Sequence, residues 1–429
     1  MKRILAIALV AIFVLGFAVS AFALEVTGKG ESIDISGYYF LRGVAQNNVT
    51  DWCDSAATEC NDHKNFYKQR MRVNLTFNAA EGVKAVTRFD IMETSLGNDT
   101  KQGTTSVTED GANVQFDYAY LQVNGMGGID WTLGRQVANW GTGFATWGAV
   151  KDRIKAMKKI GDVSVGAIIQ KDSENNYGGR GGGDVDTYYV LAVIPVGEGK
   201  LGFIYGDTHD NNDDVENNAT GMDLYYMGKA GPVNLAVEYN SKDRDDFKAP
   251  VGGCTTAAVG ACQVDAQTGM LIAANMDIND KVNVGLGYAS AANGWTADDD
   301  FSPTLFFGTN VSPNAIINFG ETWNPSPTTN ENDDTVSAIV LSGKFKINDD
   351  LTAGANIAQA TLSDNSEYDL MEIDLYANYK VAANTTLYLG YAMGTPDAST
   401  TKADAHTNTA GAFVDDPFTT AAIQIKTNF

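Results

Sequence analysis

The sequence predicts an all-β fold: a transmembrane, antiparallel, up-and-down β-barrel of about 18 strands, with about 16 as the alternative count. Three observations lead to this prediction. Segments in which apolar and polar residues alternate recur along the chain, as in strands with one apolar face. The connections between them are tight turns alternating with mostly long polar stretches. The first residues have the layout of an export signal.

Residues 1–23 are expected to be a secretory signal peptide. Lys2 and Arg3 precede an uninterrupted apolar run from Ile4 to Val19, and Ala21-Phe22-Ala23 supplies small residues at the cleavage positions. A retained transmembrane anchor is the alternative, because the run approaches spanning length. Acidic and glycine-rich sequence follows at once, so we expect cleavage and a single barrel domain over residues 24–429.

After this segment, no apolar run in the sequence could span a bilayer as a helix. A membrane protein of this kind must cross as a closed barrel, because lipid offers the backbone no hydrogen-bond partners. The composition agrees, with 44 Gly and 18 Tyr but only 9 Pro. A soluble periplasmic or surface β-protein is the alternative that membrane partitioning would exclude.

The predicted strands are recognised by alternation flanked by turn residues. In chain order their centres lie near Tyr38, Val73, Ala85, Ala119, Trp131, Ala156, Val165, Leu191, Phe203, Tyr225, Leu235, Ala273, Gly285, Leu341, Gly354, Leu375, Leu389 and Ile423. Tight turns are expected at Ala79–Gly82, Gly125–Gly128, Gly161-Asp162, Gly197–Gly199, Gly231-Pro232, Asn279-Asp280, Asn348–Asp350 and Ala382–Asn384.

The long connections, such as Ser241–Asp265 and Ala291–Asp334, alternate with these turns, although Ser363–Ser366 is short. Short turns on one rim and long loops on the other are typical of outer-membrane barrels. Aromatic residues of the apolar parity fall near strand ends, as expected where amphipathic rings meet lipid headgroups. Those at the long-loop end are Phe89, Tyr239, Tyr288 and Tyr391, and those at the short-turn end are Phe77, Phe345, Tyr379 and Phe429.

The opposite parity is polar and should line the lumen. The predicted basic lining residues are Lys68, Arg70, Arg72, Lys84, Arg88, Arg153 and Lys155, and the acidic ones are Asp223, Glu238, Glu372 and Asp374. Basic residues early in the chain would then face acidic ones across the barrel, giving a transverse field that screens ions by charge. A filled barrel is the alternative, but about 18 strands enclose more space than side chains fill.

One connection differs from the others. Residues 139–148 read Asn-Trp-Gly-Thr-Gly-Phe-Ala-Thr-Trp-Gly, which is uncharged and aromatic, so we expect it to fold into the lumen as a constriction formed by Trp140, Phe144 and Trp147. An aromatic cap on the outer rim is the alternative. Gly134-Arg135-Gln136 precedes it, and the last strand, in which alternate residues are apolar, ends in Phe429.

With these features the chain resembles bacterial porins, whose third loop narrows the pore, although the acidic residues common in that loop are missing here. The terminal Phe429 is similar to the signal read by the barrel-assembly machinery. The resemblance implies residence in the outer membrane of a Gram-negative bacterium, contact with its lipids, and homotrimers as one form of assembly. It is a likeness of architecture and does not select one porin subfamily.

The remaining features narrow the function. A net charge of −23 argues against nucleic acid as a partner. Cys53 with Cys60 and Cys254 with Cys262 are expected to form two local disulfides, with metal binding as the competitor. All three histidines fall in predicted loops, so we expect no metal site and no enzyme. No cofactor is expected, although the acidic stretch Asp207–Glu216 has ligand types suited to Ca²⁺ if it is more than a solvated loop.

The sequence therefore favours a passive channel for small hydrophilic solutes and ions. The competing hypothesis is a porin-like scaffold that sheathes a partner, such as an electron-transfer cytochrome. Neither the transported solute nor the ion preference follows from the sequence.

Overall fold

The computed structural model describes residues 32–47, 64–96, 114–174, 184–210, 218–244, 266–293, 295, 297–298, 335–363, 368–398 and 417–429. The predicted signal peptide and all four cysteines lie outside these residues, as do His63 and His406. Within the described ranges, no helix is long and apolar enough to cross a membrane.

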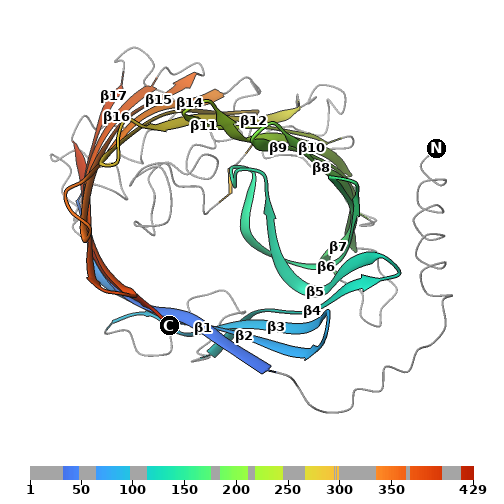
Figure 1. The fold of residues 1–429 in the computed structure, drawn as a ribbon. Helices are drawn as coiled ribbons and strands as arrows, with labels where there is room; N and C mark the ends of the chain where they lie inside the picture. The colour runs from blue at the N-terminus through green and yellow to red at the C-terminus, as the bar shows by residue number, and fades with distance from the viewer. Residues whose placement is uncertain are drawn as a thin grey trace, which may run out of the picture.

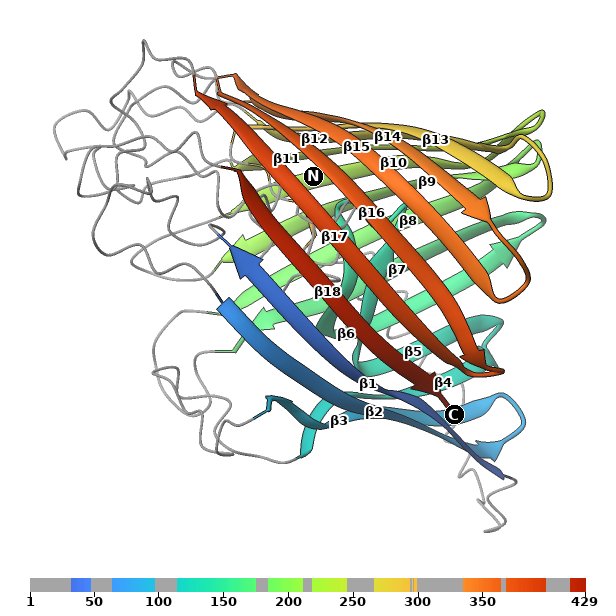
Figure 2. The same cartoon turned by 90° about the vertical axis from the view of Figure 1, so that its left-hand side faces the viewer.

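The described residues form one closed antiparallel sheet of 18 strands (Figure 1, Figure 2). The strands are β1 Ser32–Asn47, β2 Lys64–Ala80, β3 Val83–Ser95, β4 Val114–Met126, β5 Ile129–Trp140, β6 Thr146–Ile160, β7 Val163–Ser173, β8 Val185–Val196, β9 Gly199–Asp210, β10 Ala219–Ala230, β11 Val233–Arg244, β12 Gln267–Asp277, β13 Val282–Ala292, β14 Thr335–Lys346, β15 Leu351–Ser363, β16 Tyr368–Ala382, β17 Thr385–Ala398 and β18 Phe418–Asn428. Each of the predicted strand centres lies in a different strand, so the predicted fold class is confirmed.

Neighbours in sequence are neighbours in the sheet, and β1 closes the barrel by pairing with both β2 and β18. The seam ends at the last residue. Gly37 and Phe429 exchange backbone hydrogen bonds of 2.9 and 3.0 Å. The Phe429 ring lies over Gly37, where an added Cβ would be 2.8 Å from the ring. The carboxyl-terminal aromatic residue therefore packs on the strand that closes the barrel.

The two faces of the wall differ as the alternation predicts. In β10, Met222 and Leu224 are 42% and 44% exposed on the outside, whereas Asp223 between them is 3% exposed. In β16, Met371 and Leu375 are exposed while Glu372 and Asp374 are fully buried. An apolar outer face with polar groups turned inward is the pattern required of a barrel surrounded by lipid.

One hairpin leaves the wall. The pairing of β4 with β5 runs from Met126↔Ile129 only as far as Ala119↔Arg135, and the pairing of β6 with β7 begins at Asp152↔Lys171. Over residues 136–151, the pairings within the described strands join β5 only to β6. We call these residues the inward hairpin, because Figure 1 shows them crossing the barrel interior toward β10–β12.

The hairpin turns inward at a glycine. Gly134 has a φ of +119°, and an added Cβ there would lie 2.8 Å from the carbonyl oxygen of Ala119. A side chain at this position would meet both backbone strain and a clash. Just beyond it, the buried side-chain amide of Gln136 donates to the carbonyl oxygens of Thr132, Gly134 and Arg153, each at 3.2 Å. These bonds fix the bend.

Two loop predictions were wrong. His209 lies within β9, where its imidazole is 3.4 Å from the Asp207 carboxylate. Asp207–Asp210, the first part of the acidic stretch predicted as a loop, also belongs to β9, because that strand continues its pairing with β8 as far as Val185↔Asp210. The remainder of that stretch lies outside the described ranges.

Candidate functional site

The tip of the inward hairpin is held against the opposite wall by one carboxylate. Glu238 on β11 accepts hydrogen bonds from the backbone N–H of Thr142 at 2.5 Å, the Thr142 hydroxyl at 2.6 Å and the backbone N–H of Ala145 at 3.0 Å. Its side chain is fully buried. Gly141 allows this close approach, because its φ is +60° and an added Cβ would collide with Glu238 Oε2.

The aromatic residues predicted to form a constriction occupy three different settings. Trp140 donates its indole N–H to Asp223 on β10 at 2.8 Å and lies edge-on to Tyr225. Phe144 is fully buried and packs against Trp295 in a tilted arrangement, with ring centroids 4.6 Å apart. Its carbonyl oxygen accepts a hydrogen bond from the backbone N–H of Asp298. Trp147 is 47% exposed. Trp140 and Phe144 therefore attach the tip, while Trp147 faces open space.

Asp223 and Glu238, which the sequence predicts as acidic pore-lining residues, are thus both bonded to the inward hairpin. Sequence reasoning could not reveal this role, because the hairpin and its anchors are separated by 83 to 96 residues. Glu372 and Asp374 are buried on the inner face of β16, and Asp374 accepts a bond of 3.0 Å from the Asn356 amide.

A group of basic residues covers the inner face where the barrel closes. Register places Lys426 beside Phe40 and Phe40 beside Arg70, while Arg42 lies between Gln424 and Lys68. We call Arg42, Lys68, Arg70, Arg72 and Lys426 the basic patch. Four of their cationic groups lie over two inward rings: Lys426 and Arg72 are 4.3 and 5.7 Å from the Tyr38 centroid, and Arg42 and Arg70 are 5.1 and 5.7 Å from that of Phe40. The Lys68 ammonium is 5.8 Å from the Phe66 centroid. Arg42 and Lys426 were absent from the predicted lining set.

Two of the predicted basic lining residues are neutralised by neighbouring acids. Arg72 makes a bidentate pair with Asp90 on β3, with both distances 2.7 Å. Arg88 pairs with Asp117 on β4. A register shift beside Arg88 leaves Asp117 as the extra residue of a bulge, so simple alternation does not identify it as a lining residue.

The other predicted basic residues are dispersed. Lys84 is exposed beside the β2–β3 turn, at the rim rather than at mid-barrel. Arg153 donates to Gln170 at 2.6 Å and lies 5.8 Å from the Tyr189 ring centroid, and Lys155 is its neighbour along β6.

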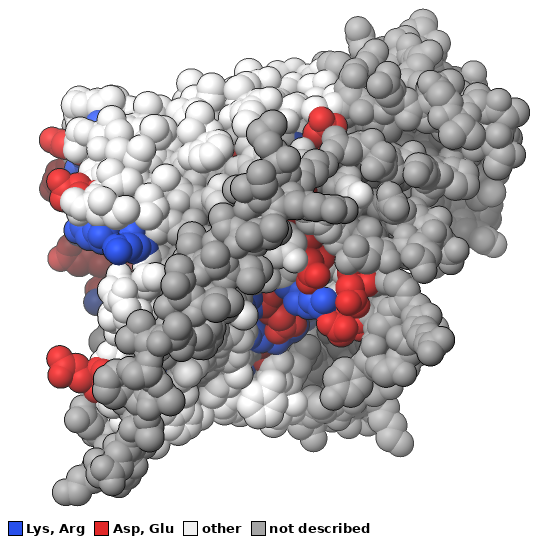
Figure 3. Space-filling view, turned by 90° about the vertical axis from the view of Figure 1, so that its right-hand side faces the viewer, with Lys and Arg blue, Asp and Glu red and all other residues white. Residues whose placement is uncertain are grey.

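Ion pairs flank the point where the hairpin leaves the wall: Arg135–Asp152 at 3.0 Å and Lys151–Asp172 at 3.3 Å. Figure 3, which views the molecule from the right-hand side of Figure 1, shows acidic and basic side chains gathered near the middle of that side.

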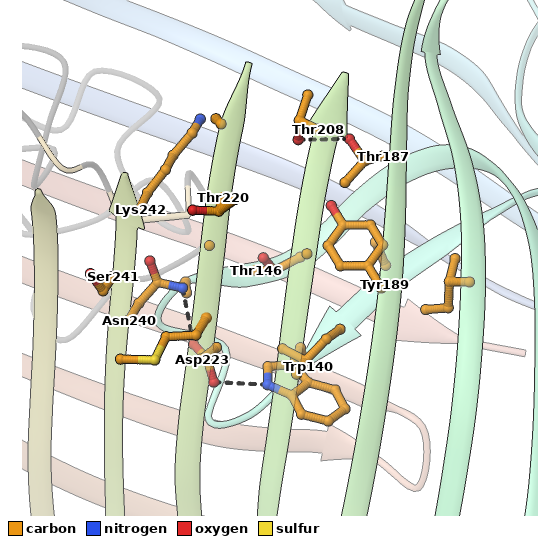
Figure 4. A pocket seen from close by; sticks show the side chains of 18 of the residues that line it. Trp140, Thr146, Thr187, Tyr189, Thr208, Thr220, Asp223, Asn240, Ser241 and Lys242 are labelled. Carbon is orange, nitrogen blue, oxygen red and sulfur yellow. Dashed lines mark hydrogen bonds between the residues drawn. The ribbon is translucent and has the colours of Figure 1, made fainter. Parts of the chain in front are cut away.

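Between the inward hairpin and the wall lies a cavity of about 430 Å³, which we call the side cavity (Figure 4). Trp140 and Thr146 line it from the hairpin, and the facing strands β8–β11 contribute polar and aromatic side chains. These include Thr187, Tyr189, Thr208, Asp223, Asn240 and Lys242. The hairpin therefore separates this space from the basic patch, which lies on the opposite side of the barrel (Figure 1).

Among the residues that the structure describes, no group of three or more His, Cys, Asp or Glu side chains is arranged to hold a metal ion. The predicted disulfides Cys53–Cys60 and Cys254–Cys262 fall outside those residues, as does the part of the candidate calcium-binding stretch from Asn211 to Glu216.

Comparison with known proteins finds no matching family model and no matching curated protein. Among solved structures, the outer-membrane channel DcaP of Acinetobacter baumannii gives a TM-score of 0.48 at 11% identity, covering 93% of this chain and 97% of that one. OccK8 (OprE) of Pseudomonas aeruginosa matches with a TM-score of 0.53 at 11% identity, covering 93% and 98%. OpdK of the same organism, solved with vanillate, matches with a TM-score of 0.51 at 10% identity, covering 92% and 98%. The chain therefore has the closed antiparallel barrel fold of outer-membrane porins.

Proposed function

We propose that this protein is an outer-membrane channel through which small hydrophilic solutes and ions diffuse passively. One observation carries the proposal: a closed barrel with apolar side chains outside and charged side chains inside also carries a hairpin anchored across its interior. A barrel of this size is too wide to be filled by its own wall side chains, and an inward hairpin narrows such a passage.

We further propose that the channel prefers anions. The basic patch and Arg88 bring six cationic groups to the inner face of β18, β1, β2 and β3, and two carboxylates, Asp90 and Asp117, are paired with members of this group. Asp223 and Glu238 are engaged in holding the hairpin. Fixed positive charge at a pore wall raises the local concentration of anions.

The same geometry argues against the competing hypothesis of a scaffold that sheathes a partner. A scaffold that sheathes a folded partner needs a clear interior, whereas here a hairpin crosses from β5–β6 to β10–β11 and is bonded at its far end. A channel should conduct ions alone, whereas a scaffold should show no activity until its partner is bound.

The test is the reversal potential of the purified protein in planar bilayers under a salt gradient. We expect conductance with a preference for Cl⁻ over K⁺, and we expect the double variant Arg42→Gln/Arg70→Gln to move the reversal potential toward that of K⁺. Lys346→Gln is the matched control, because Lys346 pairs with Asp349 at the short-turn rim. A wild-type protein that conducts without preferring Cl⁻ would refute the anion preference, and an unchanged potential in the double variant would refute the basic patch as its cause. A protein that never conducts would refute the channel.

A further inference from the structure

The side cavity has the chemistry of a binding site that is separate from the basic patch. Its volume of about 430 Å³ falls within the range of about 300–1,000 Å³ that is typical of small-molecule sites. Its lining residues belong to the wall strands or to the inward hairpin, apart from Trp295, which follows β13. The Trp140–Asp223 hydrogen bond lies at its lower end in Figure 4, and Lys242 and Thr208 lie near the ends of their strands.

One wall of the cavity is a flat aromatic surface. Tyr189 on β8 is the cross-strand partner of Gly206 on β9. An added Cβ at Gly206 would be 2.6 Å from the Tyr189 ring, so the ring lies directly on the glycine. The other face of the ring is turned toward the cavity, where Figure 4 shows Tyr189 among the lining residues, and the Arg153 guanidinium lies over the ring, 5.8 Å from its centroid. Such a face packs well against the C–H face of a saturated ring.

The polar lining is mostly neutral. The Thr187 hydroxyl donates to the Asp172 carboxylate at 2.6 Å, and its oxygen lies 3.0 Å from the Thr208 hydroxyl oxygen, beside Tyr189. Asn240 presents an amide from β11, whose oxygen accepts the Trp295 indole N–H at 2.7 Å. The carboxylate of Asp223 is engaged by Trp140 at 2.8 Å and by Asn240 at 3.3 Å. Arg153 donates its Nε–H to Gln170 and lies over Tyr189. With the Thr187 proton given to Asp172, the hydroxyl and amide oxygens of the lining meet a ligand as acceptors. They therefore suit a ligand that donates through hydroxyls better than a simple anion, which only accepts.

We propose that the side cavity binds a neutral pyranose sugar, with the C–H face of the sugar on Tyr189 and its hydroxyls toward the Thr187, Thr208 and Asn240 side chains. This binding goes beyond the proposed channel and does not depend on conduction. It gives the barrel two compartments of different chemistry: a cationic wall on one side of the inward hairpin and a sugar site on the other.

The experiment is calorimetric titration of the full-length protein in detergent with glucose, maltose, sorbitol and gluconate. We expect saturable binding of glucose or maltose in about the millimolar range, and weaker binding of the two open-chain compounds, which have no ring to stack. Tyr189→Ala should weaken sugar binding about tenfold or more, while Tyr189→Phe, which keeps the ring, should retain it.

Tyr376→Ala is the matched control. Tyr376 lies on Gly354 as Tyr189 lies on Gly206, with its ring in the space that an added Cβ would take, but it belongs to β16 in the other compartment. This variant should bind sugar normally. Heat-modifiable migration on gels reports folding. If Tyr189→Ala does not fold, Thr208→Leu reduces the cavity volume instead and should weaken binding by a similar factor.

Three results would overturn the inference: no saturable binding of either sugar by the wild-type protein, gluconate binding more tightly than glucose, or equal losses in Tyr189→Ala and Tyr376→Ala. Because the titration is made in detergent and the channel is tested by reversal potential, either proposal can fail while the other holds. Arg42→Gln/Arg70→Gln should change ion preference and leave sugar binding intact.

Discussion

Replacement of Glu238 by Ala should release the inward hairpin from the wall. The Glu238 carboxylate accepts three hydrogen bonds from the hairpin tip, two of them from backbone N–H groups of Thr142 and Ala145. A hydrogen bond to a charged group contributes about 1.5–3 kcal/mol, so the three together stabilise the attached position by about 4–5 kcal/mol at the lower bound. Each 1.4 kcal/mol is a factor of ten, so the ratio of attached to detached hairpins should fall by about three orders of magnitude.

The detachment is not expected to be complete, because Trp140 remains bonded to Asp223 and Phe144 remains packed against Trp295. Single-channel recording is the assay. We expect a larger mean conductance with frequent fluctuations, since a hairpin that moves opens and closes the passage. Glu238→Gln should be intermediate, because an amide offers one acceptor oxygen and places an NH₂ group against a donor.

A double-mutant cycle of Glu238→Gln with Thr142→Val tests whether the bond is direct, since residues in contact give non-additive changes. Thr142→Ser keeps the hydroxyl and should behave like the wild-type protein. If Glu238→Ala gave the same conductance and the same current noise as the wild-type protein, the carboxylate would not be the anchor of the hairpin.

Three further predictions concern other parts of the barrel. Asp90→Asn removes the charged bidentate partner of Arg72, so it should move the reversal potential toward that of Cl⁻. This shift is opposite in direction to the one expected when the charges of the basic patch are removed. An unchanged reversal potential would place the Arg72–Asp90 pair outside the ion path. Gly134→Val forces a branched side chain into a φ of +119° against the Ala119 carbonyl oxygen and should destabilise the folded barrel by about 1–3 kcal/mol, measured as a lower urea midpoint of the folded gel band. Gly287→Ala, where an added Cβ meets nothing within 4 Å, is its control and should leave that midpoint within experimental error. Deletion of Phe429 removes the ring that covers Gly37 at the seam and should lower the yield of folded barrel in refolding with lipid vesicles, whereas Phe429→Tyr should restore it.

The number, order and positions of the strands were all predictable from the sequence. Alternation is a local property that each segment carries in its own residues, and the turns at Gly161-Asp162 and Gly231-Pro232 are equally local. In an up-and-down barrel, neighbours in sequence are neighbours in space, so a correct list of strands already gives most of the topology. The inward direction of Arg72, Glu238 and Asp374 follows from the same parity.

What the sequence could not give depends on contacts between distant residues. Arg42 and Lys426 join one patch because closure pairs β1 with β18, which brings together residues separated by 382 positions in the pair Arg42–Gln424. Asp117 turns inward because a bulge shifts its register, and Glu238 serves as an anchor because the hairpin reaches it from β5–β6. Local patterning thus determined which residues form the wall and which face is apolar. Only the closed tertiary structure decided which charges pair, which hold the hairpin and which are left to act on a solute.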